Sequence, residues 1–125
     1  MSQIINPSMN QPMNDLPNLL EQRCEDIAKG TKGLVIPTIE SYLNMLSGWD
    51  VTLDYASIHK TFAFKNYHQT VSFVNAVSWV AHKEDHHPEI CFGYNQCKIT
   101  LKTHNIKGLS QNDMIMAAKI NALLD

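Results

Sequence analysis

The sequence predicts an α+β fold, in which one antiparallel sheet of four strands carries about three helices on one face. Two observations support this fold class: strand-like segments come in two pairs, and a long helix-like segment separates the pairs. Further helix-like segments precede and follow them, so the order is helix, strand, strand, helix, strand, strand, helix. The 125 residues are enough for one domain with a modest core.

Composition narrows the class of protein. Hydrophobic residues make up 44% of the chain and the formal net charge is -2, which suits a globular protein and indicates neither nucleic acid nor an anionic membrane as a partner. No apolar run reaches the roughly 20 residues of a membrane span, and the first residues do not resemble a secretory signal. We therefore expect a cytoplasmic protein. Three cysteines without a CxxC pair are expected to be free thiols.

The first half of the chain divides into a tail, a helix and a strand pair. Residues 1–17 are rich in Asn, Gln, Met and Pro without any period, so we expect a mobile tail before one domain spanning 18–125. A short helical turn is expected within 18–30. From Pro37 to Leu46, apolar residues recur at helical spacing, with Pro37 in the first turn.

Two strands should follow as a hairpin. Apolar and polar residues alternate from Trp49 to Tyr55, and a short turn leads to a second strand over 58–65. Asn66 then caps a long helix, with Gln69 in capping-box position, and Pro88 should stop that helix.

The second half ends in another strand pair and a helix. Strands are expected over 89–95 and 97–103, with Ile99, Leu101 and Thr103 on the same face. Ser110 and Asp113 form a capping-box pattern at the start of the last helix. We expect Asp113 to be structural, with catalysis as the less favoured role.

Four histidines gather at two neighbouring element ends: His82, His86 and His87 near a helix end, and His104 at a strand end. Histidine exchanges protons near neutral pH, since its unperturbed pKa is about 6.5. Spacing alone allows metal-free acid/base catalysis or a three-histidine zinc site. His82 and His86 have the i, i+4 spacing of helical zinc ligands, but Lys83 stands where a HExxH motif has its glutamate. His59 and His68 lack such neighbours and are expected on the surface.

These histidines belong to a longer pattern, which is His82 to Glu89, Tyr94-Asn95, Thr100 to His104, Gly108 to Ser110, and Asp113. The pattern resembles that of the pterin-4a-carbinolamine dehydratase family, and the resemblance covers about residues 35–124. Trp49, after a glycine, also matches a tryptophan at the start of the family's first strand. One departure is His82, where better-known members have glutamate.

The resemblance implies an enzyme with the fold described above, without metal or bound cofactor. Its substrate would be the 4a-hydroxytetrahydropterin left by an aromatic amino-acid hydroxylase, and its product the quinonoid dihydropterin. Dehydration needs one proton delivered to the 4a-hydroxyl and one removed from N5. We assign these transfers to His86 and His104. His87 would bind the pterin and its hydroxyl and share in proton transfer.

The resemblance also suggests further substrate contacts. Trp49 would form an apolar wall, although a core position is equally compatible with its sequence. The backbone around Glu84, Asp85 and His86 would bond the pterin's amide edge, and His82 would lie beside it.

Two other functions remain open on sequence grounds. Members of the family also act as dimerisation cofactors of a homeodomain transcription factor, so a binding module is the first alternative. A zinc hydrolase built on the same histidines is the second. Family precedent predicts a homodimer or a homotetramer.

Overall fold

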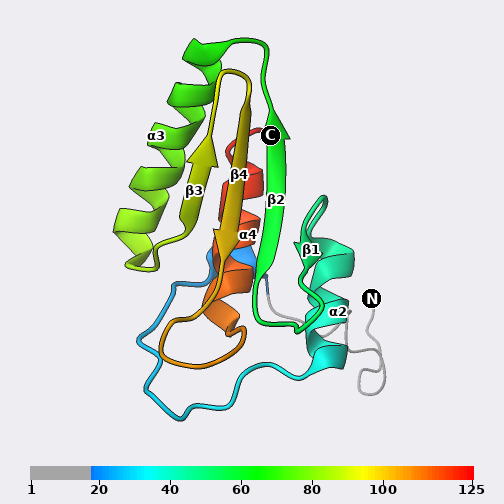
Figure 1. Cartoon of the computed structure of the whole chain (residues 1–125). Coiled ribbons are helices and arrows are strands. Elements are labelled where there is room, and N and C mark those ends of the chain that lie inside the picture. Colours follow the sequence, from blue (N-terminus) through cyan, green and yellow to red (C-terminus); the bar gives the residue numbers. More distant parts are fainter. Residues whose placement is uncertain (1–17) are drawn as a thin grey trace, which may run out of the picture.

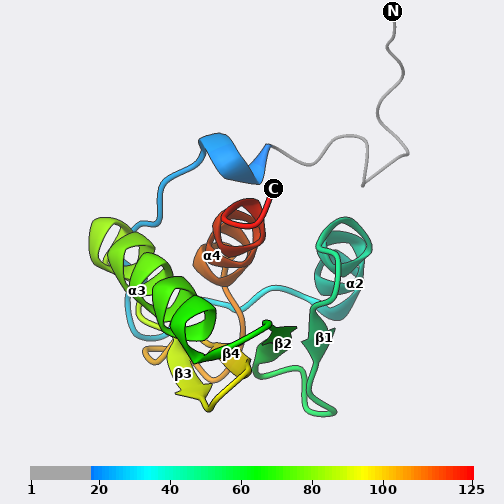
Figure 2. The ribbon, with the colours of Figure 1, turned by 90° about the horizontal axis from the view of Figure 1, so that it is seen from above.

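The computed structural model describes residues 18–125 and places an open four-stranded antiparallel sheet beneath three α-helices (Figure 1). The strand order is β1-β2-β4-β3. Seen along the strands, all three helices lie on one side of the sheet, with α4 in the middle (Figure 2). The predicted α+β fold is confirmed. The predicted tail, residues 1–17, lies outside the described residues.

The elements have the following bounds. The strands are β1 (Asp50–Val51), β2 (Ile58–Ala63), β3 (Glu89–Phe92) and β4 (Gln96–Leu101). The helices are the short 3₁₀ helix η1 (Leu19–Glu21), α2 (Ile36–Met45), α3 (Tyr67–Glu84) and α4 (Gln111–Ala122).

The core lies between the sheet and the helices. Every second residue of β4 (Cys97, Ile99 and Leu101) is buried, as the alternation predicts. Helix α4 is buried around most of its circumference, because sheet, α3 and η1 all contact it. Its buried apolar residues are Met114, Ile115, Met116, Ala117 and Ile120.

The first strand is much shorter than predicted, and its extension to Tyr55 is wrong. Only Asp50 and Val51 pair with β2. The Thr52 hydroxyl donates to Asp54 Oδ1 at 2.7 Å, and the same oxygen accepts the Ala56 N–H at 3.1 Å. These local bonds offer the backbone an alternative to the sheet ladder, and the side chain of Leu53 is fully exposed as a result.

Helix α3 ends four residues before Pro88. Asp85 takes a left-handed conformation, with φ of 54°, and its N–H bonds the Ala81 carbonyl. The N–H of His86 bonds the same carbonyl at 3.3 Å. This closure leaves His86 outside the helix, so His82 and His86 are not a pair of i, i+4 side chains on one helix.

The remaining elements follow the sequence pattern closely. Asn66 caps α3 by accepting the Gln69 N–H at 2.9 Å. The buried apolar residues of α4 stop at Ile120, whereas Leu123 and Leu124 lie beyond the helix and are exposed. Within residues 18–125, none of the helices has the length and apolarity needed to cross a membrane.

Candidate active site

The predicted histidines converge at the end of the sheet where α3 and β4 finish and α4 begins. His86 and His87 lie in the connection from α3 to β3, and His104 lies just after β4. All three line one pocket of about 180 Å³. The full lining is Glu25, Asp26, Ile27, Asp85, His86, His87, Thr103, His104, Asn105 and Asn112.

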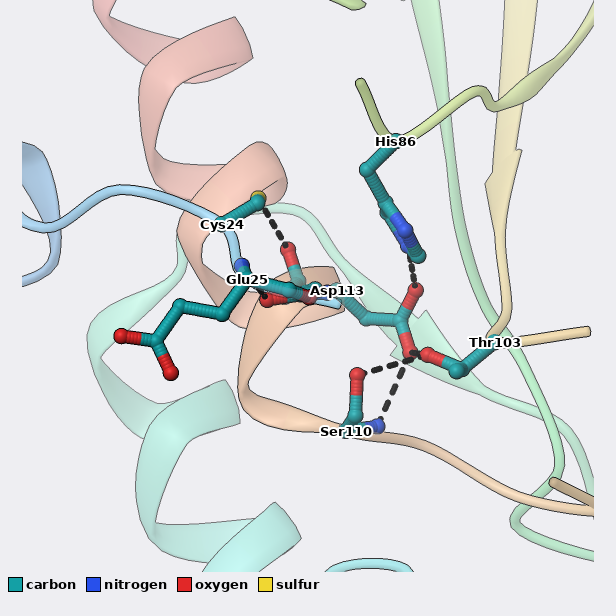
Figure 3. A network of polar contacts seen from close by, with 7 residues as sticks. Cys24, Glu25, His86, Thr103, Ser110 and Asp113 are labelled. Atoms are coloured by element: carbon teal, nitrogen blue, oxygen red, sulfur yellow. Dashed lines mark hydrogen bonds and ion pairs between the residues drawn. The ribbon is translucent and has the colours of Figure 1, made fainter. Parts of the chain in front are cut away.

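A buried carboxylate supports one of these histidines (Figure 3). His86 Nε2 lies 2.7 Å from Asp113 Oδ1. The other oxygen, Oδ2, accepts the Thr103 hydroxyl at 2.7 Å and the Ser110 N–H at 3.0 Å. Thr103 Oγ1 is also 2.6 Å from Ser110 Oγ. Since the one hydroxyl proton of Thr103 goes to Asp113, the Ser110 hydroxyl donates to Thr103.

This chain of bonds assigns the tautomer of the neutral His86 ring. Asp113 is fully buried and surrounded by donors, which is the environment of an ionised carboxylate. Its Oδ1 therefore accepts a proton-bearing Nε2. The second ring nitrogen of His86, Nδ1, is then an acceptor without a partner among residues 18–125, and the side chain is 11% exposed at the pocket.

Asp113 thus has two roles, and the sequence pattern favoured only the structural one. It closes the capping box with Ser110 at the start of α4, as predicted. It also orients His86, which a capping pattern alone cannot reveal. The available signal was its place in the family pattern beside the histidines.

His87 and His104 differ from His86 in their surroundings. Both are exposed, and both also line a second hollow of about 500 Å³. The rest of that hollow's lining includes Thr100, Glu89 and Lys102. The two exposed histidines therefore stand between two hollows, whereas His86 lines only the first.

Asp85 lines the histidine pocket, but the neighbouring Glu84 does not. The Glu84 carboxylate is buried, accepting the Cys24 N–H at 2.8 Å and the Lys119 ammonium at 2.7 Å. Arg23 completes the cluster at 3.0 Å. Burial alone would raise the pKa of Glu84, but the bonds from Lys119, the Cys24 N–H and Arg23 lower it to about 2.

The other expected substrate contacts also lie away from the pocket lining. Trp49 is a core residue, whose Nε1 donates to Asn121 at 3.0 Å. His82 is exposed, with its ring 5.5 Å from that of Trp79. The N–H groups of Asp85 and His86 are already bonded within the helix end, which leaves only carbonyls there for a ligand.

Among residues 18–125, no group of three or more His, Cys, Asp or Glu side chains is placed to hold a metal ion. The three cysteines are free, as expected. Burial, together with the nearby charge of Glu84, raises the pKa of Cys24 to about 12, and burial raises that of Cys97 to about 11. These two thiols are protonated at neutral pH and are poor nucleophiles.

Sequence reasoning missed one wall of the pocket, residues 25–27. The short helical turn expected within 18–30 is η1 (Leu19–Glu21), and residues 25–27 follow it without regular secondary structure. No periodicity or motif marks them.

Comparison with known proteins finds a family and several relatives with similar sequences. The model of the family described as "Pterin 4 alpha carbinolamine dehydratase" matches residues 34–123. A protein of Hydrogenovibrio crunogenus, provisionally named pterin-4-alpha-carbinolamine dehydratase, is 71% identical over 107 residues, which are 86% of this chain and 95% of that protein. A Nitrosomonas eutropha protein with the same provisional name is 45% identical over 90% of this chain and 98% of its own.

Two solved structures are also similar. A crystal structure from Brucella melitensis, titled as a transcriptional coactivator/pterin dehydratase, has a TM-score of 0.70 and 32% identity, covering 75% of this chain and 100% of that one. A pterin dehydratase-like protein, identified as a RuBisCO assembly factor of the alpha-carboxysome, has a TM-score of 0.54 and 30% identity, covering 61% of this chain and 88% of that one.

Proposed function

This chain belongs to the pterin 4 alpha carbinolamine dehydratase family, and from that premise we propose that it removes water from a 4a-hydroxytetrahydropterin to give the quinonoid dihydropterin. The observation that carries the proposal is the contact between His86 and the buried Asp113, in a pocket that His87 and His104 also line. A histidine so held is ready to take a proton.

The reaction consists of one bond broken to oxygen and two proton transfers. The lone pair of N5 forms a double bond to C4a while the bond from C4a to the hydroxyl oxygen breaks. A proton delivered to that oxygen lets it leave as water, and N5 loses its own proton. Because the catalyst gives one proton and takes another, it needs neither an oxidant nor a reductant.

We assign His86 as the base, because its Nδ1 is the free acceptor nitrogen and Asp113 would stabilise the imidazolium that forms. His104 is assigned as the acid that protonates the leaving hydroxyl. Each transfer would accelerate the reaction by about 10²–10⁴-fold when the groups are in place. His87 binds the pterin and its hydroxyl and shares in proton transfer. Asp85 lies at the rim as a substrate contact.

The test is a dehydration assay, in which the 4a-carbinolamine is generated in place and the quinonoid product is followed. After subtraction of the uncatalysed rate, His86→Ala and His104→Ala should each lower kcat by about 10²-fold or more. His87→Ala should mainly raise KM, as expected for a contact made equally in ground and transition states. His59→Ala and His68→Ala are matched controls that should leave both constants unchanged.

The same assay separates the zinc alternative. Turnover that survives chelator treatment, in protein holding far less than one equivalent of zinc, supports the acid/base mechanism. Stoichiometric zinc with chelator-sensitive turnover would replace it with metal-assisted hydrolysis. Wild-type turnover in the His86 and His104 variants would remove the assigned pair.

The cellular setting stays a prediction. We propose a cytoplasmic homodimer or homotetramer that acts after an aromatic amino-acid hydroxylase. Light scattering of the purified protein measures the number of subunits, and a mass equal to one chain would contradict the oligomer.

A further inference from the structure

The pocket has a wall that the family match does not include. Residues 23–27, here called the arm, precede the match, which begins at residue 34. Three of them, Glu25, Asp26 and Ile27, line the histidine pocket. Figure 3 shows Cys24 and Glu25 passing beside the start of α4, close to Asp113.

The first tie of the arm is to Asn112 on α4. The Glu25 N–H donates to Asn112 Oδ1 at 3.0 Å, and Asn112 Nδ2 donates to the Glu25 carbonyl at 2.6 Å. One amide side chain therefore satisfies both peptide groups of Glu25, much as a neighbouring strand would. Asn112 is buried and immediately precedes Asp113, the carboxylate that orients His86.

The second tie is to the loop after β4. Asn105 Nδ2 donates to the Ile27 carbonyl at 2.7 Å. Asn105 directly follows His104, so this bond joins the arm to the backbone that carries the assigned acid.

The third tie is to the end of α3. The Cys24 N–H donates to Glu84 Oε1 at 2.8 Å, and Arg23 donates to the Lys83 carbonyl at 3.0 Å. Glu84 stands two residues before His86. All three anchors (Glu84, Asn105 and Asn112) are thus within two residues of His86, His104 or Asp113, although they come from different elements.

This placement has a physical consequence. An irregular segment loses conformational freedom when it is ordered, so it stays in place only where specific bonds hold it. Here those bonds all start from residues next to the site. Loosening any one would open the wall of the pocket without touching an imidazole.

We propose that the arm is a substrate-positioning element, which closes the histidine pocket over the pterin and sets its affinity. The inference rests on the proposed dehydratase function. The arm supplies contacts made equally in the ground and transition states, so its loss acts on KM, whereas the histidines act on kcat.

The test compares arm anchors with a matched asparagine elsewhere on α4. Asn105→Ala and Asn112→Ala should each raise KM about three- to tenfold, the factor that corresponds to one ordinary hydrogen bond. Their kcat and its pH profile should match wild type, because the imidazoles are unchanged. Asn105→Gln keeps an amide donor and should recover part of the affinity. Asn121→Ala is the control: it breaks bonds to Ser47, Trp49 and Lys60, and should lower Tm while KM stays at the wild-type value.

The outcomes separate the two proposals. An active wild type whose Asn105 and Asn112 variants keep the wild-type KM overturns the arm and leaves the dehydratase intact. A rise in KM for Asn121→Ala equal to theirs also overturns it, since the effect would then be general destabilisation. If the wild type does not dehydrate the substrate, the proposed function fails. The arm is then judged by the Kd of a stable 7,8-dihydropterin in the same variants, and no binding or no change in Kd overturns it.

Discussion

The two ends of α4 are built in the same way, yet only one carries the candidate site. At the N-terminal end, the carboxylate of Asp113 joins the helix to Thr103 and His86. At the C-terminal end, the amide of Asn121 joins it to Trp49 at 3.0 Å and to Lys60 at 2.8 Å. At each end, one polar side chain of α4 forms hydrogen bonds with two residues from other parts of the chain.

Hollow size does not explain the difference. The hollow beside Asn121 is about 500 Å³, whereas the histidine pocket is about 180 Å³. The hollow beside Asn121 is lined by apolar residues such as Leu20 and Met45 and by polar ones such as Ser47 and Asp125, but not by any histidine. What distinguishes the N-terminal end is that its chain of bonds finishes on an imidazole with one acceptor nitrogen still free. This difference supports the proposal that the lone pair on His86 Nδ1, rather than the space around it, suits this end to proton transfer.

The largest effect on catalysis is expected from Asp113→Asn. The new amide must turn its oxygen to Thr103 and Ser110, because both donate to Oδ2. Its NH₂ then faces His86 Nε2 and forces the proton onto Nδ1, so the base is lost. We expect kcat to fall by about 10²–10⁴-fold, with KM within about threefold, as for an analogous change in serine proteases. A variant that retains half of the wild-type kcat would show that the tautomer does not matter.

Glu84→Gln should mainly lower the free energy of unfolding. It removes the buried charge at the end of α3 that bonds α4 and the arm. The pKa of Glu84 is lowered from 4.5 to about 2, so the ionised form stabilises the fold above pH 4.5. That stabilisation, about 3 kcal/mol, should disappear as the pH falls from 4.5 towards 2. Urea unfolding of both proteins at pH 7 and at lower pH measures the difference. An equal gap at pH 7 and pH 3 would refute this linkage.

At the other end of the helix, Asn121→Ala should reduce stability without reducing catalysis. Trp49 and Lys60 would each lose a partner, so we expect the free energy of unfolding to fall by about 1–2 kcal/mol. The measured kcat should equal that of wild type. A loss of kcat larger than about tenfold would mean that both ends of α4 support the chemistry.

The smallest effect is expected from His82→Ala. His82 is exposed and its ring contacts Trp79, so stability should change by less than about 0.5 kcal/mol. Both kcat and KM should stay at wild-type values in the dehydration assay. A several-fold rise in KM would restore His82 to the substrate site and extend that site along α3.

The sequence predicted the fold well where apolar residues repeat, as in α3, β4 and α4. It failed at Leu53, because alternation there is overridden by bonds among Thr52, Asp54 and Ala56, which no period records. The histidines were predictable as a group, since they cluster at element ends and match a family pattern.

Other site assignments depended on contacts between distant residues. Glu84 sits beside the histidines in sequence, but its charge is taken up by Arg23 and Lys119 from other parts of the chain. Trp49 fits a substrate wall and a core equally well by sequence, and only packing against Phe62 places it in the core. The arm has no local pattern, because side chains of other elements hold it.

Sharing Asp113 between two tasks constrains how this protein can change over generations. Its Oδ2 accepts the Ser110 N–H at the start of α4, and its Oδ1 bonds the imidazole of His86. A substitution that adjusts the reactivity of His86 through this carboxylate therefore also disturbs the first turn of α4. Neither property can drift alone, and a graft of the histidines onto another scaffold would have to bring Ser110, Thr103 and the start of the helix with them.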